Sequence, residues 1–272
     1  MKLRILPAST GAQWVRTALR TFFRQPLALG GLFFMFVAIV AVVSLVPVLG
    51  SVLALGLLPS ATLGLMAATR EAVQGRFPMP SVLLTAWRAG PEQTRAMVVL
   101  GALYAGLFLA IMALSALIDG GDFARVYLLG EKLEADLATQ ADFQGAMWVS
   151  MALYLPLSLM FWHAPALVHW HRVSPIKALF FSLVACVRNF GAYFVFAMAW
   201  MVVFLGAVIL VSVLLTIVSV LLGQSEPNTA AMVPVVLLMA AMFMVSTYFT
   251  FLDTFEHPEG PNVPPVQESP HV

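Results

Sequence analysis

The sequence predicts an all-α polytopic membrane protein, a helical bundle with about six transmembrane helices and further amphipathic helices at the cytoplasmic interface. Three observations support this prediction. The 272-residue chain is 61% hydrophobic and only 10% charged, whereas a soluble globular protein carries roughly 25% charged residues. Its apolar residues form uninterrupted blocks of about twenty, the length that crosses the hydrocarbon core as a helix. Its lysines and arginines gather in loops that share one side of the membrane.

The first two spans come from residues 25–69, which contain no charged residue. As one helix this segment would be roughly 68 Å long, more than twice the ~30 Å hydrocarbon core, so it must turn. Pro47 and Gly50 mark the turn. Several arginines precede the first block, and the block is longer than a signal-peptide core. We therefore expect a retained first span in place of a cleaved leader.

Four further spans follow from the remaining apolar blocks. Pro156 and Pro165 are expected to bend the fourth span. The last long apolar segment holds one charge, Glu226, within a turn-forming sequence that separates the final two spans. The predicted spans are near residues 27–46, 48–69, 96–118, 146–168, 191–222 and 232–252. They make a single transmembrane domain, 1–257, followed by a proline-rich, disordered cytoplasmic tail, 258–272.

The distribution of basic residues predicts the orientation. Twelve of the fourteen lysines and arginines lie before the first span or in the loops after the second and fourth spans. The other two, Arg125 and Lys132, lie in segment 119–142, which carries six acidic residues. By the positive-inside rule the basic loops face the cytoplasm. We therefore expect a multi-pass protein of the bacterial inner (plasma) membrane with both termini in the cytoplasm.

A short amphipathic helix is predicted at 13–24, before the first span. At 100° per residue its aromatic and aliphatic side chains fall on one side and its arginines on the other. This split is typical of a helix in the headgroup plane, so Trp14, Arg16, Arg20 and Arg24 are candidate contacts to lipid headgroups. The alternative is an anchor that only sets topology. Similar short helices are expected before the third and fifth spans, which suggests three units of interfacial helix, span, turn and span.

Small residues at a spacing of four mark one face of the second span. Gly56, Ser60, Gly64 and Ala68 would let another helix approach closely. We interpret this stripe as packing within the molecule, in preference to a dimer seam.

The sequence contains few residues that could form a catalytic or metal-binding site. His163, His169 and His171 end the fourth span, but His163 and His169 are six residues apart and face different sides of a helix. Cys186 is the single cysteine. The sequence contains no metalloprotease, hydrolase, P-loop or dinucleotide motif, and the spans hold almost no ionisable residue. We therefore predict no catalytic residue, no cofactor and no metal, and net charge +1 gives no reason to expect nucleic-acid binding.

Three stretches resemble a family of uncharacterised proteobacterial six-pass inner-membrane proteins. They run from Leu6 to Leu27, from Val46 to Pro80 and from Ala164 to Asn189. The third stretch, an interfacial helix that ends in Arg-Asn, is also loosely similar to the membrane domain of some glycerophosphodiester phosphodiesterases. The resemblance implies a six-pass fold, and we carry no phosphodiesterase activity over from it.

These observations favour a non-enzymatic, membrane-organising or accessory protein whose partners are membrane lipids and, as a second option, another membrane protein. The competing hypothesis is a transporter or scramblase for lipids or small amphiphiles. It requires a groove between the spans lined by Ser, Thr, Tyr and Asn side chains, because a polar group crossing the membrane needs hydrogen-bond partners.

Overall fold

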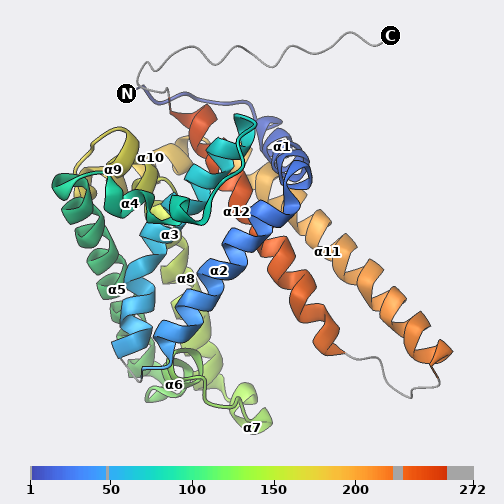
Figure 1. Cartoon of the computed structure of the whole chain (residues 1–272). Helices are drawn as coiled ribbons and strands as arrows, with labels where there is room; N and C mark the ends of the chain where they lie inside the picture. The colour runs from blue at the N-terminus through green and yellow to red at the C-terminus, as the bar shows by residue number, and fades with distance from the viewer. Residues whose placement is uncertain (1, 47–48, 223–228, 256–272) are drawn as a thin grey trace.

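The computed structural model describes residues 2–46, 49–222 and 229–255 (Figure 1). The described residues contain no strand, and an isolated antiparallel bridge pairs Leu3 with Phe255. The all-α prediction is therefore confirmed. The elements, in chain order, are α1 (Thr10–Arg24), α2 (Pro26–Ser44), α3 (Leu49–Val73), the 3-10 helix η1 (Pro80–Leu84), α4 (Thr85–Arg88), α5 (Pro91–Asp119), α6 (Asp122–Leu129), α7 (Ala135–Thr139), α8 (Ala141–Trp162), α9 (Ala164–Trp170), α10 (Pro175–Arg188), α11 (Phe190–Leu221), η2 (Thr229–Ala231) and α12 (Met232–Thr254).

Six of the described helical segments are long and apolar enough to cross a membrane: α2, α3, α5, α8 with α9, α11 and α12. They correspond in order to the six predicted spans, and α5 begins earlier than expected, at Pro91. Pro47, Glu226 and the tail 258–272 lie outside the described residues.

The order of elements repeats three times. A short helix precedes a pair of spans in α1–α2–α3, in η1/α4–α5–α8 and in α10–α11–α12. Pro26, Pro91 and Pro175 occupy the first turns of α2, α5 and α10. Proline suits this position because its fixed φ is helical and its missing N–H would have no helical partner there.

The fourth span is interrupted near its basic end. Pro156 lies inside α8 without ending it, but α8 stops at Trp162 and α9 begins at Ala164. Pro165 stands in the first turn of α9. Its ring clashes with the carbonyl four residues earlier, in α8, and proline supplies no backbone N–H, so the bend predicted at Pro165 is a break in the helix centred on His163.

The bundle has two unlike ends (Figure 1). We call one the basic end: it holds the N-terminal arm (residues 2–9), α1, η1, α4, α9 and α10. We call the other the acidic end: it holds α6, α7 and the segment 119–142. The spans α3, α8 and α12 all run toward the basic end, so higher residue numbers within them lie nearer to it.

The basic end is tied together by the N-terminal arm. The backbone N–H of Leu6 donates to Oδ1 of Asn189 (2.8 Å), and Nδ2 of Asn189 donates to the carbonyl of Arg4 (3.0 Å). The N–H of Arg4 donates to the carbonyl of Thr254 at the end of α12 (3.0 Å). Asn189 is buried where α10 meets α11, so its side-chain amide joins the N-terminal arm to these two helices. The bond from Arg4 joins the arm to α12 as well.

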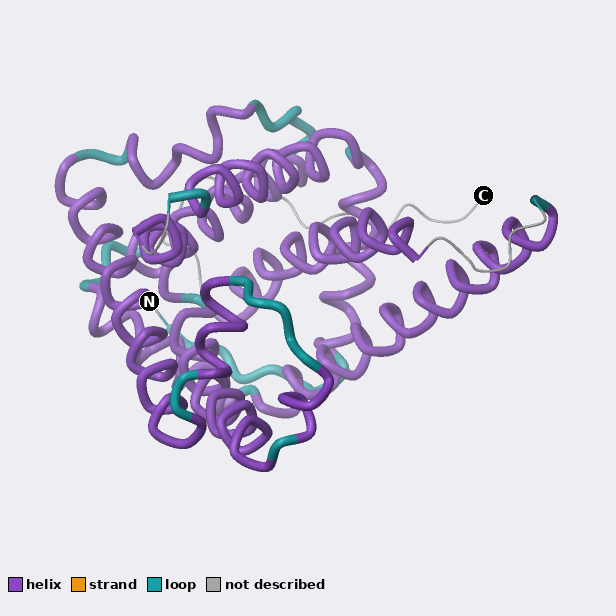
Figure 2. The backbone as a smooth tube through the Cα atoms, turned by 90° about the horizontal axis from the view of Figure 1, so that it is seen from below, coloured by secondary structure: helices purple, strands orange, loops and turns teal. Residues whose placement is uncertain are grey.

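Toward the acidic end the helices separate. Figure 2, seen from below, shows α11 extending away from the rest of the bundle. None of its most apolar 18-residue stretch is buried, compared with 61% of the corresponding stretch of α3. The large hydrophobic side chains exposed from Val202 onward are aliphatic, which is the composition of a helix surface that faces lipid.

Candidate functional site

The predicted lipid-contacting residues of α1 divide into two groups. Arg16, Arg20 and Arg24 are exposed, as a headgroup contact requires. Trp14 is 1% exposed and lies inside the protein, so its assignment as a headgroup contact is wrong. Its indole N–H donates to Oδ2 of Asp253 (2.8 Å). The amphipathic pattern identified an apolar face correctly, but that face packs on α11 and α12, because periodicity does not say whether lipid or protein covers it.

Part of α1 still faces outward. Leu19, Arg20, Phe23 and Arg24 border one shallow surface hollow. Phe23 is 65% exposed next to the two arginines. An exposed aromatic ring beside guanidinium groups is the arrangement that binds at a lipid surface.

The small-residue stripe of α3 makes contacts inside the chain. A Cβ atom at Gly64 would lie 2.9 Å from the Cα atom of Leu83 in η1, so only glycine fits there. Gly56 faces Gly101 of α5, where a Cβ atom at Gly101 would lie 2.2 Å from the carbonyl oxygen of Gly56. Ser60 and Ala68 are buried on the same helix.

The three histidines do not form a metal site. No group of three metal-ligating side chains occurs among the described residues. His163 is fully buried, and its Nε2 shares a hydrogen bond with the hydroxyl of Tyr193. The backbone N–H of His163 donates to Oγ of Ser182 (2.9 Å), which joins the α8–α9 break to α10.

A groove of about 280 Å³ lies between α3, α5, α8, α9 and α12, within the membrane-spanning part of the bundle. Five of its side chains carry hydroxyl groups. Its lining residues are Leu58, Pro59, Thr62, Tyr104, Tyr154, Ser158, Phe161, Trp162, Pro165, Phe243, Met244 and Thr247. None of them is charged.

The hydrogen bonds of these hydroxyls define what the groove can recognise. Thr62, Ser158 and Thr247 donate to carbonyls of their own helices, three or four residues earlier. Their oxygens can still accept a hydrogen bond. The hydroxyls of Tyr104 and Tyr154 lie 3.4 Å apart. One can donate to the other, which leaves a single O–H free to donate to an occupant.

A second hollow, of about 420 Å³, adjoins the groove on its acidic side. Both are lined by Leu58, and Phe108 of the second hollow stacks on Tyr104 of the groove, with ring centroids 6.3 Å apart. The second hollow also contacts Ser44 of α2 and Tyr127 of α6. Together the two hollows extend from the middle of the spans toward the acidic end.

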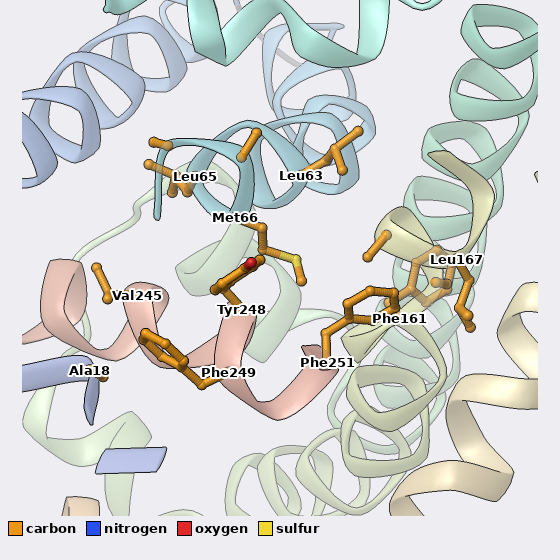
Figure 3. Packing of buried hydrophobic residues seen from close by; sticks show 14 of the residues in the cluster. Ala18, Leu63, Leu65, Met66, Phe161, Leu167, Val245, Tyr248, Phe249 and Phe251 are labelled. Atoms are coloured by element: carbon orange, nitrogen blue, oxygen red, sulfur yellow. The ribbon is translucent and has the colours of Figure 1, made fainter. Parts of the chain in front are cut away.

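On the basic side of the groove's lining residues, large apolar side chains pack against one another (Figure 3). Leu63 and Met66 of α3, Leu167 of α9 and Phe251 of α12 are at most about 1% exposed, and Tyr248 is 4% exposed. Each lies beyond the groove in the direction of the basic end. The groove is therefore bounded by packed side chains on its basic side.

Cys186 has no nucleophilic character. It is 2% exposed in α10, outside the spans, and its thiol contacts the carbonyl of Leu159. Burial raises the pKa of Cys186 to about 12, because a thiolate is poorly solvated there. At neutral pH the residue is a thiol, and the thiolate is the reactive form.

The six spans and the uncharged groove define a polytopic α-helical membrane protein. The chain is 38% identical over 269 residues to a probable inner membrane protein of Burkholderia thailandensis, and the match covers 97% of this chain and 98% of the relative. The chain therefore belongs to the family of that protein and is an integral, multi-pass inner-membrane protein. No protein-family model matches the chain, and no solved structure matches it. The resemblance to an uncharacterised family of proteobacterial inner-membrane proteins is confirmed.

Sequence reasoning missed several residues that the structure brings together. Tyr104 and Tyr154 are fifty positions apart, and nothing in either segment indicates that their hydroxyls meet. Gly101 has a local signal, because Gly101 and Ala105 repeat the small-residue spacing of four. Asn189 stood out only as the end of a helix, and its bonds to the N-terminal arm follow from the tertiary structure.

Proposed function

We propose that this protein is a non-enzymatic lipid-contacting membrane protein whose groove holds the polar group of a neutral amphiphile. The observation that carries the proposal is the gathering of Thr62, Tyr104, Tyr154, Ser158 and Thr247 in one membrane-embedded groove. Hydroxyls placed together within the hydrocarbon region are costly unless they are hydrogen-bonded, and they mark functional surfaces more often than lipid-facing ones.

The lining favours an uncharged occupant. A phosphate or ammonium group at this depth needs an opposite charge, because burying an unpaired ion is far more costly than burying a neutral polar group. The groove offers one free tyrosine O–H and several accepting oxygens. An ester carbonyl, a ketone or an alcohol satisfies these groups. The rings of Phe161 and Phe243 suit the attached apolar chain.

The candidate catalytic groups argue for binding without chemistry. The Cys186 thiol is protonated at neutral pH, and His163 shares a hydrogen bond with Tyr193 inside the packed core. Neither of them lines the groove.

We further propose that the basic end faces the cytoplasm, with both termini there. The support is the placement of twelve of the fourteen basic residues on that end. In this orientation the groove and the adjoining hollow open toward the outer leaflet.

The test is to measure which lipids the purified protein retains in mild detergent, by mass spectrometry of the extracted lipids. We expect a neutral, carbonyl- or hydroxyl-bearing amphiphile to be enriched over the membrane average. The double variant Tyr104→Phe/Tyr154→Phe should lower its occupancy several-fold. Thr216→Val, which removes an exposed hydroxyl from α11, is the matched control and should change nothing. Equal retention by wild type and double variant would refute the groove as the binding site.

The adjoining positions of the two hollows favour a second function, movement of the amphiphile between the outer leaflet and the groove. Leu58 lines both hollows, so Leu58→Trp should block passage while leaving the basic end intact. A fluorescent-lipid transfer assay in proteoliposomes tests this function. Transfer that is absent in wild type, or that is unchanged in Leu58→Trp, argues for static binding alone.

The exposed face of α1 supports the accessory role of a membrane-organising protein. Replacing Arg16, Arg20 and Arg24 with alanine should lower the amount of co-purified anionic lipid. Arg125→Ala, at the acidic end, serves as the control. If the triple variant retains as much anionic lipid as wild type, α1 acts only as an anchor.

A further inference from the structure

A separate cavity of about 470 Å³ lies at the basic end, between the end of α3, the η1–α4 segment and α9. It shares no residue with the groove. Its lining is Glu71, Met79, Ser81, Val82, Thr85, Arg88, Ala89 and His169. Cavities of this size hold small molecules or headgroups, and this one combines a carboxylate, a guanidinium and an imidazole.

The two opposite charges of the cavity are not used by the protein. Glu71 and Arg88 form no ion pair with any residue in the part of the chain that the structure describes. Both nevertheless line the same cavity, one from α3 and one from α4. A carboxylate and a guanidinium that face one space without pairing can bind the two ends of a zwitterion.

Further polar groups lie at the cavity or beside it. The Nδ1 atom of His169 is buried and has no hydrogen-bond partner among the described residues. The guanidinium of Arg70 does not line the cavity and lies over the ring of Trp170, at 5.8 Å from the ring centroid. The hydroxyl of Ser81 is exposed at the cavity. The cavity lining itself offers one carboxylate, one guanidinium and a hydroxyl, which match the one ammonium and one phosphate of a zwitterionic headgroup.

The segment that forms the outer wall faces the lipid surface. Phe77 and Met79 are 62% and 61% exposed, and Leu84 and Trp87 are also exposed. Large apolar side chains on a short segment beside arginines are typical of a membrane interface. The contact between Leu83 and Gly64 holds this wall on α3. The cavity thus lies where headgroups are, and its apolar rim is where acyl chains would enter.

We propose that this cavity binds the headgroup of a zwitterionic phospholipid that carries a primary amine. The ammonium group pairs with the carboxylate of Glu71, and the phosphate pairs with Arg88 and receives a hydrogen bond from Ser81. The acyl chains run outward along Phe77 and Trp87. This site differs from the groove in place and in ligand, since the groove is uncharged.

The experiment is a native mass-spectrometry titration of the delipidated full-length protein with phosphatidylethanolamine, phosphatidylcholine and phosphatidylglycerol of the same chain length. Wild type should bind phosphatidylethanolamine most tightly. Glu71→Gln, an isosteric change at a partly exposed position, should weaken that binding about tenfold and remove the preference over phosphatidylcholine. Arg88→Gln should weaken all three lipids. Glu92→Gln and Arg95→Gln, which lie outside the cavity, are the matched controls.

A charge reversal keeps the test informative if neutral variants fold poorly. Glu71→Lys should shift the preference from phosphatidylethanolamine to the anionic phosphatidylglycerol. The proposal is overturned if wild type prefers phosphatidylglycerol, or if the phosphatidylethanolamine preference survives in Glu71→Gln. Free phosphoethanolamine that binds as tightly as the lipid would assign the cavity to a soluble zwitterion and overturn the lipid assignment.

Discussion

The basic and acidic halves of this bundle are built from the same kinds of residues but are held together differently. At the basic end α12 is continuously buried from Val245 to Phe251, and α11 buries Phe196 and Trp200. Toward the acidic end α11 and α12 leave large aliphatic side chains exposed, among them Leu210, at 60%. Both halves are apolar, so composition does not distinguish them.

The difference shows where cohesion in a membrane protein comes from. Lipid tails are as apolar as leucine, so burying a leucine between spans brings no hydrophobic gain within the bilayer. Close packing and hydrogen bonds must hold the helices, and both are concentrated at the basic end. The acidic half relies on lipid to cover its helices, and the second hollow lies in this half.

The largest expected effect concerns the reactivity of Cys186 in the packed half. Burial raises the pKa of its thiol to about 12. At pH 8 only a very small fraction of Cys186 is therefore thiolate, and this fraction increases as the pH rises. Modification by a soluble maleimide at pH 8 should be on the order of a thousandfold slower than for an exposed cysteine. Rates should rise about tenfold per pH unit between 8 and 10 if local opening is not limiting.

The control is Ile176→Cys in a Cys186→Ala background, because Ile176 is 74% exposed on the same helix. Comparable labelling rates at the two positions would mean that the basic end opens readily. That result would contradict the conclusion that the basic end is the more tightly held of the two.

The next effect is on stability. Leu167→Ala, at a fully buried position of the basic end, should lower the free energy of unfolding by about 3 kcal/mol because it leaves a cavity. Leu210→Ala, the same substitution on the lipid-exposed part of α11, should cost less than about 0.5 kcal/mol. Unfolding in mixed detergent micelles measures both. Similar losses of unfolding free energy at the two positions would show that Leu210 is packed against protein, for example a partner protein, and does not face lipid.

A smaller loss is expected when the N-terminal arm is released. Asn189→Ala removes the acceptor of the Leu6 N–H and the donor to Arg4, and leaves a partly buried N–H without its partner. We expect about 2 kcal/mol of destabilisation and faster proteolysis of the arm. Gln13→Ala, an exposed amide of α1, is the control. An arm as protease-resistant as in wild type would show that Asn189 does not hold it.

The smallest effect isolates one hydrogen bond. Trp14→Phe keeps an aromatic ring and removes the N–H that donates to Asp253. We expect the free energy of unfolding to fall by about 1 kcal/mol more than the change in packing alone would cause. Trp200→Phe is the matched control, since Trp200 is buried and its indole N–H has no hydrogen-bond partner among the described residues. Equal losses in the two variants would assign the role of Trp14 to packing alone.

Much of the fold follows from local signals. Long uncharged blocks determine the six spans, and prolines such as Pro26 and Pro175 mark where helices begin, because each depends only on neighbouring residues. The groove could not be predicted this way. Tyr104 and Tyr154 belong to different helices, and two hydroxyls meet only when the rotation of each helix about its axis is known.

The sequence by itself determined the class of this protein: an all-α, six-span, multi-pass membrane protein with short helices before each pair of spans. Hydrophobicity and helix-initiating residues act over one or two turns, so they can be recognised without a structure. The tertiary structure decided which partner each face meets. It placed Trp14 in the protein interior while Arg20 faces outward, and it brought Glu71 and Arg88 to one cavity, because apolar and polar surfaces have several possible partners and only packing selects among them.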